Sequence, residues 1–214
     1  RDIDNNANRR GGAIFLHGNT TENCTNTTVS NSNFDHNFAG RNGGAIDWQE
    51  GANDGNIYNS TFTNNMANAN GGAVFWSGHD GEVHDSNFTN NTAKGTVTDI
   101  HGNSGDGGAI IWSGINGTIT NSRFINNSAN KRGGAVYLQN CTHGDCDNTT
   151  FDWCVFINNT AGVNGGALDW RDGAHNGNVY NSTFTYNTAG SNGGAIFWSG
   201  HHGVICDSNF TNNT

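Results

Sequence analysis

Apolar residues recur at fixed positions in seven short stretches of the chain. Each stretch contains a Phe-x-x-Asn motif, with an apolar residue five positions before Phe and Asn three positions after it. The seven Phe residues are Phe34, Phe62, Phe88, Phe124, Phe156, Phe184 and Phe210. The stretches between turn-forming residues are only four to six residues long and show no apolar stripe of helical period. This pattern predicts short strands and no helices.

A second motif alternates with the first. Gly-Gly-Ala is followed by an aliphatic residue, a variable residue, and then Trp or Leu. The triplets begin at Gly11, Gly43, Gly71, Gly107, Gly133, Gly165 and Gly193. The order of repeat lengths itself recurs after 122 residues, and residues 43–92 and 165–214 are identical at 35 of 50 positions. The chain therefore contains about seven units of 26 to 36 residues, and a block of four units has been duplicated.

Units this short cannot bury an apolar face alone, so they must stack on one another. Coils of short strands joined by tight turns form a parallel β-helix, an all-β fold of about seven coils spaced by roughly 4.8 Å. We expect the Phe residues and the Asn residues to form two rows along its axis, with Asn amides bonded in a ladder. Gly-Gly supplies a turn without a Cβ, and the absence of Pro fits strands that all donate to a neighbour.

We interpret residues 1–214 as one β-helix region, a segment of a longer array, because neither end carries the atypical repeat that caps most solenoids. The alternative is that the open ends pair with other copies of the chain.

Composition and charge limit the kinds of partner that the chain is expected to bind. Only 33% of the residues are hydrophobic, which is typical of disordered chains. However, charged residues amount to just 13% and the net charge is −9, so electrostatic repulsion within the chain is weak. The apolar residues are also periodic, which argues for a folded structure. The chain has no basic tract and no apolar run near 18 residues. We therefore expect neither a nucleic-acid partner nor a membrane span.

The alternation of "GGAI" or "GGAV" with "FxxN" resembles the repeat of polymorphic outer-membrane proteins of bacterial autotransporter type. It is also similar to the repeat of adhesin-like surface proteins of methanogenic archaea. The resemblance covers the whole chain. It implies a right-handed parallel β-helix displayed outside the cell and used in attachment, and it implies no catalytic residues.

Aromatic residues near Gly-Gly-Ala are the candidate partner-binding residues. Strand alternation places the variable residues on one side, where the aromatic ones are Phe15, Phe75, Tyr137 and Phe197. It places Trp48, Trp76, Trp112, Trp170 and Trp198 on the other side. Whichever side faces outward, we expect an aromatic ladder on the surface, suited to sugar stacking or to lateral protein contact. The alternative is that the rings stack only for stability.

The cysteines and sequons suit an extracellular setting. Cys141 and Cys146 lie in one loop, "CTHGDC", and are a candidate disulfide, whereas a zinc site there would lack a fourth ligand. The glycosylation candidates are Asn19, Asn23, Asn26, Asn140 and Asn148, because they fall in the longest predicted loops. We expect no metal and no cofactor.

The sequence does not place two candidate catalytic acids close to each other. The acids Asp47 and Asp169 are copies of each other four coils apart, as are Asp85 and Asp207, which is too far for two-carboxylate chemistry. We therefore expect a non-enzymatic, extracellular, adhesin-like stalk whose partners are other copies or cell-surface glycans or proteins. The alternatives are a subunit that polymerises end to end into a filament or sheath, and a polysaccharide-binding or polysaccharide-cleaving β-helix.

Overall fold

The computed structural model describes residues 2–18, 24–49, 51–98, 102, 104–139, 147–171 and 174–214. These residues form strands and turns without a helix, so the predicted all-β class is confirmed. The described part accordingly holds no helical segment able to cross a membrane.

The chain winds through four parallel sheets, here named A to D, once in each coil. Sheet A holds β1 (Asp2–Ile3), β5 (Asn33–Asp35), β9 (Thr61–Thr63), β13 (Asn87–Thr89), β17 (Arg123–Ile125), β21 (Val155–Ile157), β25 (Thr183–Thr185) and β29 (Asn209–Thr211). Sheet B holds β2 (Asn6–Ala7), β6 (Phe38–Ala39), β10 (Met66–Ala67), β14 (Thr92–Ala93), β18 (Ser128–Ala129), β22 (Thr160–Ala161) and β26 (Thr188–Ala189). Sheet C holds β3 (Ile14–Leu16), β7 (Ile46–Trp48), β11 (Val74–Trp76), β15 (Ile110–Trp112), β19 (Val136–Leu138), β23 (Leu168–Trp170) and β27 (Ile196–Trp198). Sheet D holds β4 (Thr28–Ser30), β8 (Asn56–Tyr58), β12 (Glu82–His84), β16 (Thr118–Thr120), β20 (Thr150–Asp152), β24 (Asn178–Tyr180) and β28 (Val204–Cys206).

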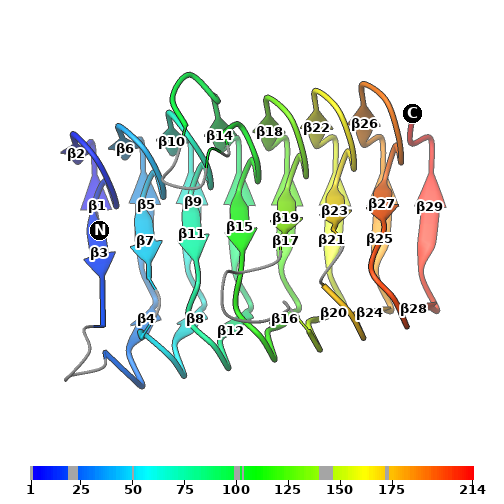
Figure 1. The fold of residues 1–214 in the computed structure, drawn as a ribbon, viewed down its shortest axis with the longest axis horizontal. Coiled ribbons are helices and arrows are strands. Elements are labelled where there is room, and N and C mark those ends of the chain that lie inside the picture. Colours follow the sequence, from blue (N-terminus) through cyan, green and yellow to red (C-terminus); the bar gives the residue numbers. More distant parts are fainter. Residues whose placement is uncertain are drawn as a thin grey trace.

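The coils lie side by side along the long axis, with the two ends of the chain at opposite ends of the rod (Figure 1). Every strand pairs in parallel with the equivalent strand of the next coil, and equivalent residues face each other, as Phe62 does with Phe88. The parallel β-helix of about seven coils is therefore confirmed.

The Phe residues form one continuous row inside the rod. Successive rings from Phe34 to Phe210 stack with centroids 4.7–4.9 Å apart and nearly parallel planes. The spacing equals that of neighbouring strands, because each ring sits directly over its equivalent. The predicted Phe row is confirmed.

The ladder of Asn residues runs beside the Phe row from Asn5 to Asn213. Each Asn side chain donates its Nδ2 to the Oδ1 of the next Asn at 2.9–3.0 Å. From Asn65 onward, the same Nδ2 also donates to the carbonyl oxygen of the Phe one coil back, at 2.9–3.0 Å. These bonds satisfy buried amides that would otherwise be costly, which explains how so polar a sequence fills an interior.

Gly-Gly is required at the turn before sheet C. Gly71 has a φ of +63°, and a Cβ on Gly72 would lie 2.1 Å from the carbonyl oxygen of Gly108 in the next coil. Neither position accepts a side chain, so the motif recurs in every coil.

Two kinds of coil differ in how they fill the corner between sheets C and D. Where sheet C ends in Trp, the residue before the sheet D strand is Gly, and a Cβ there would lie 2.1–2.4 Å from the Trp Cζ2 atom. These pairs are Trp48 with Gly55, Trp76 with Gly81, Trp112 with Gly117, Trp170 with Gly177, and Trp198 with Gly203. Where sheet C ends in Leu16 or Leu138, Thr27 or Thr149 takes the place of Gly. The paired exchange keeps the corner filled, since a Leu side chain leaves room that Thr occupies.

We expect Gly81→Thr to lower the free energy of unfolding by about 1–3 kcal/mol, because the new side chain collides with the buried Trp76 ring. In the double variant Trp76→Leu/Gly81→Thr, which copies the Leu coils, the total loss is expected to be smaller than the sum of the two single losses. Urea melts of the four proteins measure this coupling. Strict additivity would show that the two positions do not compensate.

Length variation gathers at two corners. The two longest connections from sheet C to sheet D are residues 17–27 and 139–149, as expected from motifs that keep their internal offsets. The insertion at 94–103 joins sheet B to sheet C instead, and the Thr96 backbone N–H donates to the Asn68 carbonyl oxygen at 2.8 Å. The two kinds of extra segment therefore leave the rod at different corners.

Candidate functional site

The Trp row faces the interior. The side chains of Trp48, Trp76, Trp112 and Trp170 are fully buried, and Trp198 is half-buried. Adjacent Trp rings stack at 4.2–4.8 Å. Leu138 interrupts the row, and Leu16 occupies its first position. The indole N–H groups of Trp48, Trp76 and Trp112 donate to backbone carbonyls of their own coils at 2.7–3.0 Å. The alternative in which the Trp row faces solvent is therefore wrong.

The opposite side of sheet C carries a mixed row instead of an exposed aromatic ladder. Phe75 and Tyr137 are 6% and 3% exposed, whereas Phe15 is 49% exposed and Phe197 is half-buried. Arginines cover part of this row. The Arg132 guanidinium lies 5.2 Å from the Tyr137 ring centre and donates to its hydroxyl at 2.7 Å, and Arg171 lies 5.6 Å from the Phe197 ring centre. The expected solvent-facing aromatic ladder is thus wrong, with Phe15 the exception among its aromatic members.

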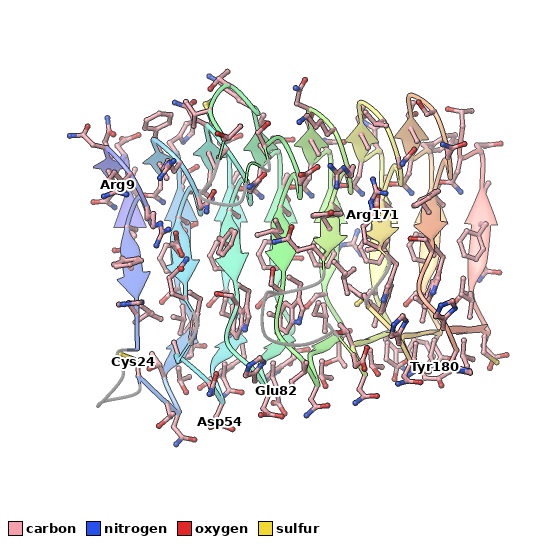
Figure 2. All side chains as sticks on the ribbon, in the orientation of Figure 1. Arg9, Cys24, Asp54, Glu82, Arg171 and Tyr180 are labelled. Carbon is pink, nitrogen blue, oxygen red and sulfur yellow. The ribbon has the colours of Figure 1, made fainter. Side chains whose placement is uncertain are left out.

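Two carboxylates interrupt the same row. Asp47 and Asp169 are completely buried, and each has an arginine Nε nearby: Arg10 at 3.8 Å and Arg171 at 3.3 Å. Gln49 donates a hydrogen bond to Asp47. Burial outweighs these partners and raises the pKa of Asp47 and of Asp169 to about 7, and it raises the pKa of Tyr137 to about 12. Figure 2 shows Arg171 over the face of sheet C.

This geometry does not assemble a catalytic pair. Asp47 lies on β7 and Asp169 on β23, four strand positions apart in sheet C, which is roughly 19 Å at the usual strand spacing. Two-carboxylate hydrolysis needs the acids within about 10 Å. Within the described ranges, no cluster of three His, Cys, Asp or Glu side chains is placed to hold a metal ion.

The pKa values of Asp47 and Asp169 predict a pH dependence of stability. In the unfolded chain both groups ionise near pH 4, but in the fold they keep their protons up to about pH 7. The folded protein then binds more protons across this window, so stability falls as pH rises from 4 to 7 and changes no further above it. The slope is about 1.4 kcal/mol per pH unit for each group.

We expect Asp47→Asn to reduce this slope by about half, because an amide does not ionise and Asp169 remains. Thermal melts at several pH values between 4 and 8 measure it. Asp54→Asn is the matched control, because Asp54 is exposed at the turn before sheet D and points away from the coil (Figure 2). The fold tolerates Asn there, since Asn occupies the equivalent positions 26, 116, 148 and 176. A slope unchanged in Asp47→Asn would contradict the assignment.

The cysteine and sequon predictions fall partly outside the described residues. Cys141, Cys146, Asn19, Asn23 and Asn140 all lie there, so the disulfide and three of the sequons stay predictions. Asn26 and Asn148 are exposed at left-handed turn positions, and their glycosylation also stays a prediction. Cys154 is fully buried in the row otherwise made of Ser, and burial raises the pKa of its thiol to about 12.

Two exposed aromatic residues were not predicted from the sequence. Trp153 is 65% exposed and Tyr186 is 56% exposed, and they lie in turns at opposite edges of sheet A. The signal was present in the repeat itself, because Trp153 is the one member of its row that is neither Asn nor Asp. The predicted binding residues were restricted to the Gly-Gly-Ala strands, where the aromatic pattern is periodic.

The fold defines the chain as a parallel β-solenoid built from short repeats. Within it, residues 59–75, 85–110, 121–139, 154–169 and 181–197 match the family model of the Chlamydia polymorphic membrane protein repeat. These five stretches are therefore similar to the repeat type that the motifs indicated. No curated protein and no solved structure matches the chain.

Proposed function

We propose that this chain is part of a non-catalytic rod displayed at the cell surface, with an adhesin-like role. The observation that carries the proposal is the match of five successive stretches to the polymorphic membrane protein repeat, on coils that stack without interruption. A rod of stacked coils suits display, because each added coil extends the molecule while burying its own apolar residues against its neighbour.

The chemistry of the surface supports a binding role more than a catalytic one. The two perturbed carboxylates are buried, distant from each other and flanked by arginines, so they are unavailable to a substrate. On an extended rod, binding would come from side chains that differ from the repeat.

Surface display is tested with antibodies raised against the recombinant chain. We expect them to label intact cells of the source organism, and external protease to remove the signal. Labelling only after permeabilisation would contradict display. Release of reducing ends from uronate or neutral polysaccharides incubated with the chain would contradict the absence of catalysis. End-to-end assembly into a filament stays a prediction, which sedimentation at rising concentration would test.

A further inference from the structure

The duplicated block contains its own comparison, because equivalent residues lie 122 positions apart in identical geometry. At sheet A and its edges, four polar residues of the first copy are replaced by apolar or aromatic ones in the second. The replaced pairs are Asn31 and Trp153, Asn33 and Val155, Asp35 and Ile157, and Asn64 and Tyr186. All four positions lie on the outer side of sheet A or in the turns at its edges.

In the first copy these residues bond to the neighbouring coil. Asn59 donates to Asn31 at 2.7 Å, and Thr61 donates to Asn33 at 2.8 Å. Asn64 donates to Asp35 at 3.3 Å. The donors Asn59 and Thr61 recur in the second copy as Asn181 and Thr183. Trp153 and Val155 offer them no side-chain acceptor, so Asn181 donates instead to Asp152 at 2.8 Å, and the bond of Thr61 to Asn33 has no counterpart between Thr183 and Val155.

The second copy also accepts a conformational cost. Trp153 and Tyr186 have φ values of +52° and +56°, a left-handed conformation that Asn adopts far more readily than an aromatic residue. Both rings are mostly exposed, so burial does not offset that cost.

The replacements lie on neighbouring coils of sheet A and in the turns at its two edges. Val155 and Ile157 are half-buried on β21, and Ile125 of β17 pairs in register with Ile157. Trp153 and Tyr186 lie at the two edges of the same sheet, on neighbouring coils. We call Ile125, Trp153, Val155, Ile157 and Tyr186 the apolar patch. Arg123 borders the apolar patch, because it pairs in register with Val155. Its side chain is exposed and has no ion-pair partner among the described residues.

We propose that the apolar patch is a docking surface for a protein partner that brings an apolar segment and a carboxylate to face Arg123. The proposal deepens the adhesin-like function and rests on it for its biological setting. Trp, Tyr and Arg are the residues that dominate protein interfaces, and here they surround an aliphatic centre. Ile125, Val155 and Ile157 offer a sugar no hydrogen bond, and the polar side chains beside them are those of Thr183 and Thr185 on β25. A symmetric pair of copies would bring together two cationic patches that contain no acid.

The test uses a display library of random twelve-residue peptides, selected on the intact chain alone. Binding of the selected peptides is then measured to the variant Trp153→Asn/Val155→Asn/Ile157→Asp/Tyr186→Asn. This variant takes the residues of the first copy, so the fold accommodates them. Fluorescence anisotropy of dye-labelled synthetic peptides measures their binding to the intact chain and to each variant. Trp153→Asn alone is the second variant, should the fourfold change disturb the fold in circular dichroism.

We expect the selected peptides to combine apolar residues with Asp or Glu. The fourfold variant is expected to weaken their binding at least about 100-fold, and Arg123→Gln about 10-fold. The control Asn56→Thr/Glu82→Thr should leave binding unchanged, because it alters sheet D to residues found at 118 and 150.

Three results would overturn the proposal: peptides that bind the variant equally, patch-dependent binding to a glycan array in place of peptides, or patch-dependent self-association in sedimentation. Because the peptide assay uses purified protein, its failure is distinguishable from failure of surface labelling on cells.

Discussion

Replacement of Phe88 by Ala is expected to lower the free energy of unfolding by about 3–5 kcal/mol. The ring is fully buried in the Phe row, with centroids 4.7 Å from Phe62 and 4.9 Å from Phe124. Its removal leaves a cavity between two stacked rings that the strands hold apart, because the backbone ladder fixes the coil spacing and the site cannot collapse.

Urea melts followed by circular dichroism measure the loss. In a solenoid each coil is stabilised by its neighbours, so the change is also expected to split the transition when the two sides of the cavity unfold separately. Asn87→Ala is the matched control, since Asn87 precedes Phe88 on the same strand with its side chain exposed. Equal losses in the two variants would contradict the inward Phe row.

Replacement of Asn91 by Ala is expected to cost at least about 4 kcal/mol, more than a single hydrogen bond is worth. The Asn91 Oδ1 accepts from the backbone N–H and the Nδ2 of Asn65, both at 3.0 Å. Its Nδ2 donates to the Phe62 carbonyl at 2.9 Å and to Asn127 at 3.0 Å. Truncation leaves buried donors and acceptors on both neighbouring coils without partners, and each costs about 1–3 kcal/mol.

The control for Asn91 is the adjacent residue. Asn90 is exposed at a φ of +56°, so Asn90→Gly removes an equal side chain while retaining the backbone conformation. We expect Asn90→Gly to change the free energy of unfolding by less than about 1 kcal/mol, as is usual for surface substitutions. A loss in Asn91→Ala no greater than that of Asn90→Gly, from the same melts, would show that the ladder is not essential.

Most of the architecture follows from sequence because the motifs keep their internal offsets while the connections change length. Phe62 and Phe88 are 26 residues apart and Phe88 and Phe124 are 36 apart, yet all three share one row. Only extra residues at a turn can absorb such differences. The longest connections from sheet C to sheet D, residues 17–27 and 139–149, accordingly lie at one corner.

The candidate site followed less well from sequence. Alternation along a strand predicts that the aliphatic residue and the Trp after Gly-Gly-Ala lie on the same side of the sheet, as Val74 and Trp76 do. It does not predict which side of the sheet faces the interior. The burial of Asp47 and Asp169 was equally unforeseen, because it depends on Arg10, Arg171 and other side chains brought from outside the strand.

By itself, the sequence determined the solenoid, the register of its coils and its polar interior, since these depend on periodicity that a linear pattern records. The tertiary structure alone decided that the Trp row is internal and that the outer row of sheet C is largely covered. It also decided that Trp153 and Tyr186, 33 residues apart, border one sheet surface together with Ile125. Such surfaces form from residues on successive coils, and their exposure depends on three-dimensional packing that no single strand encodes.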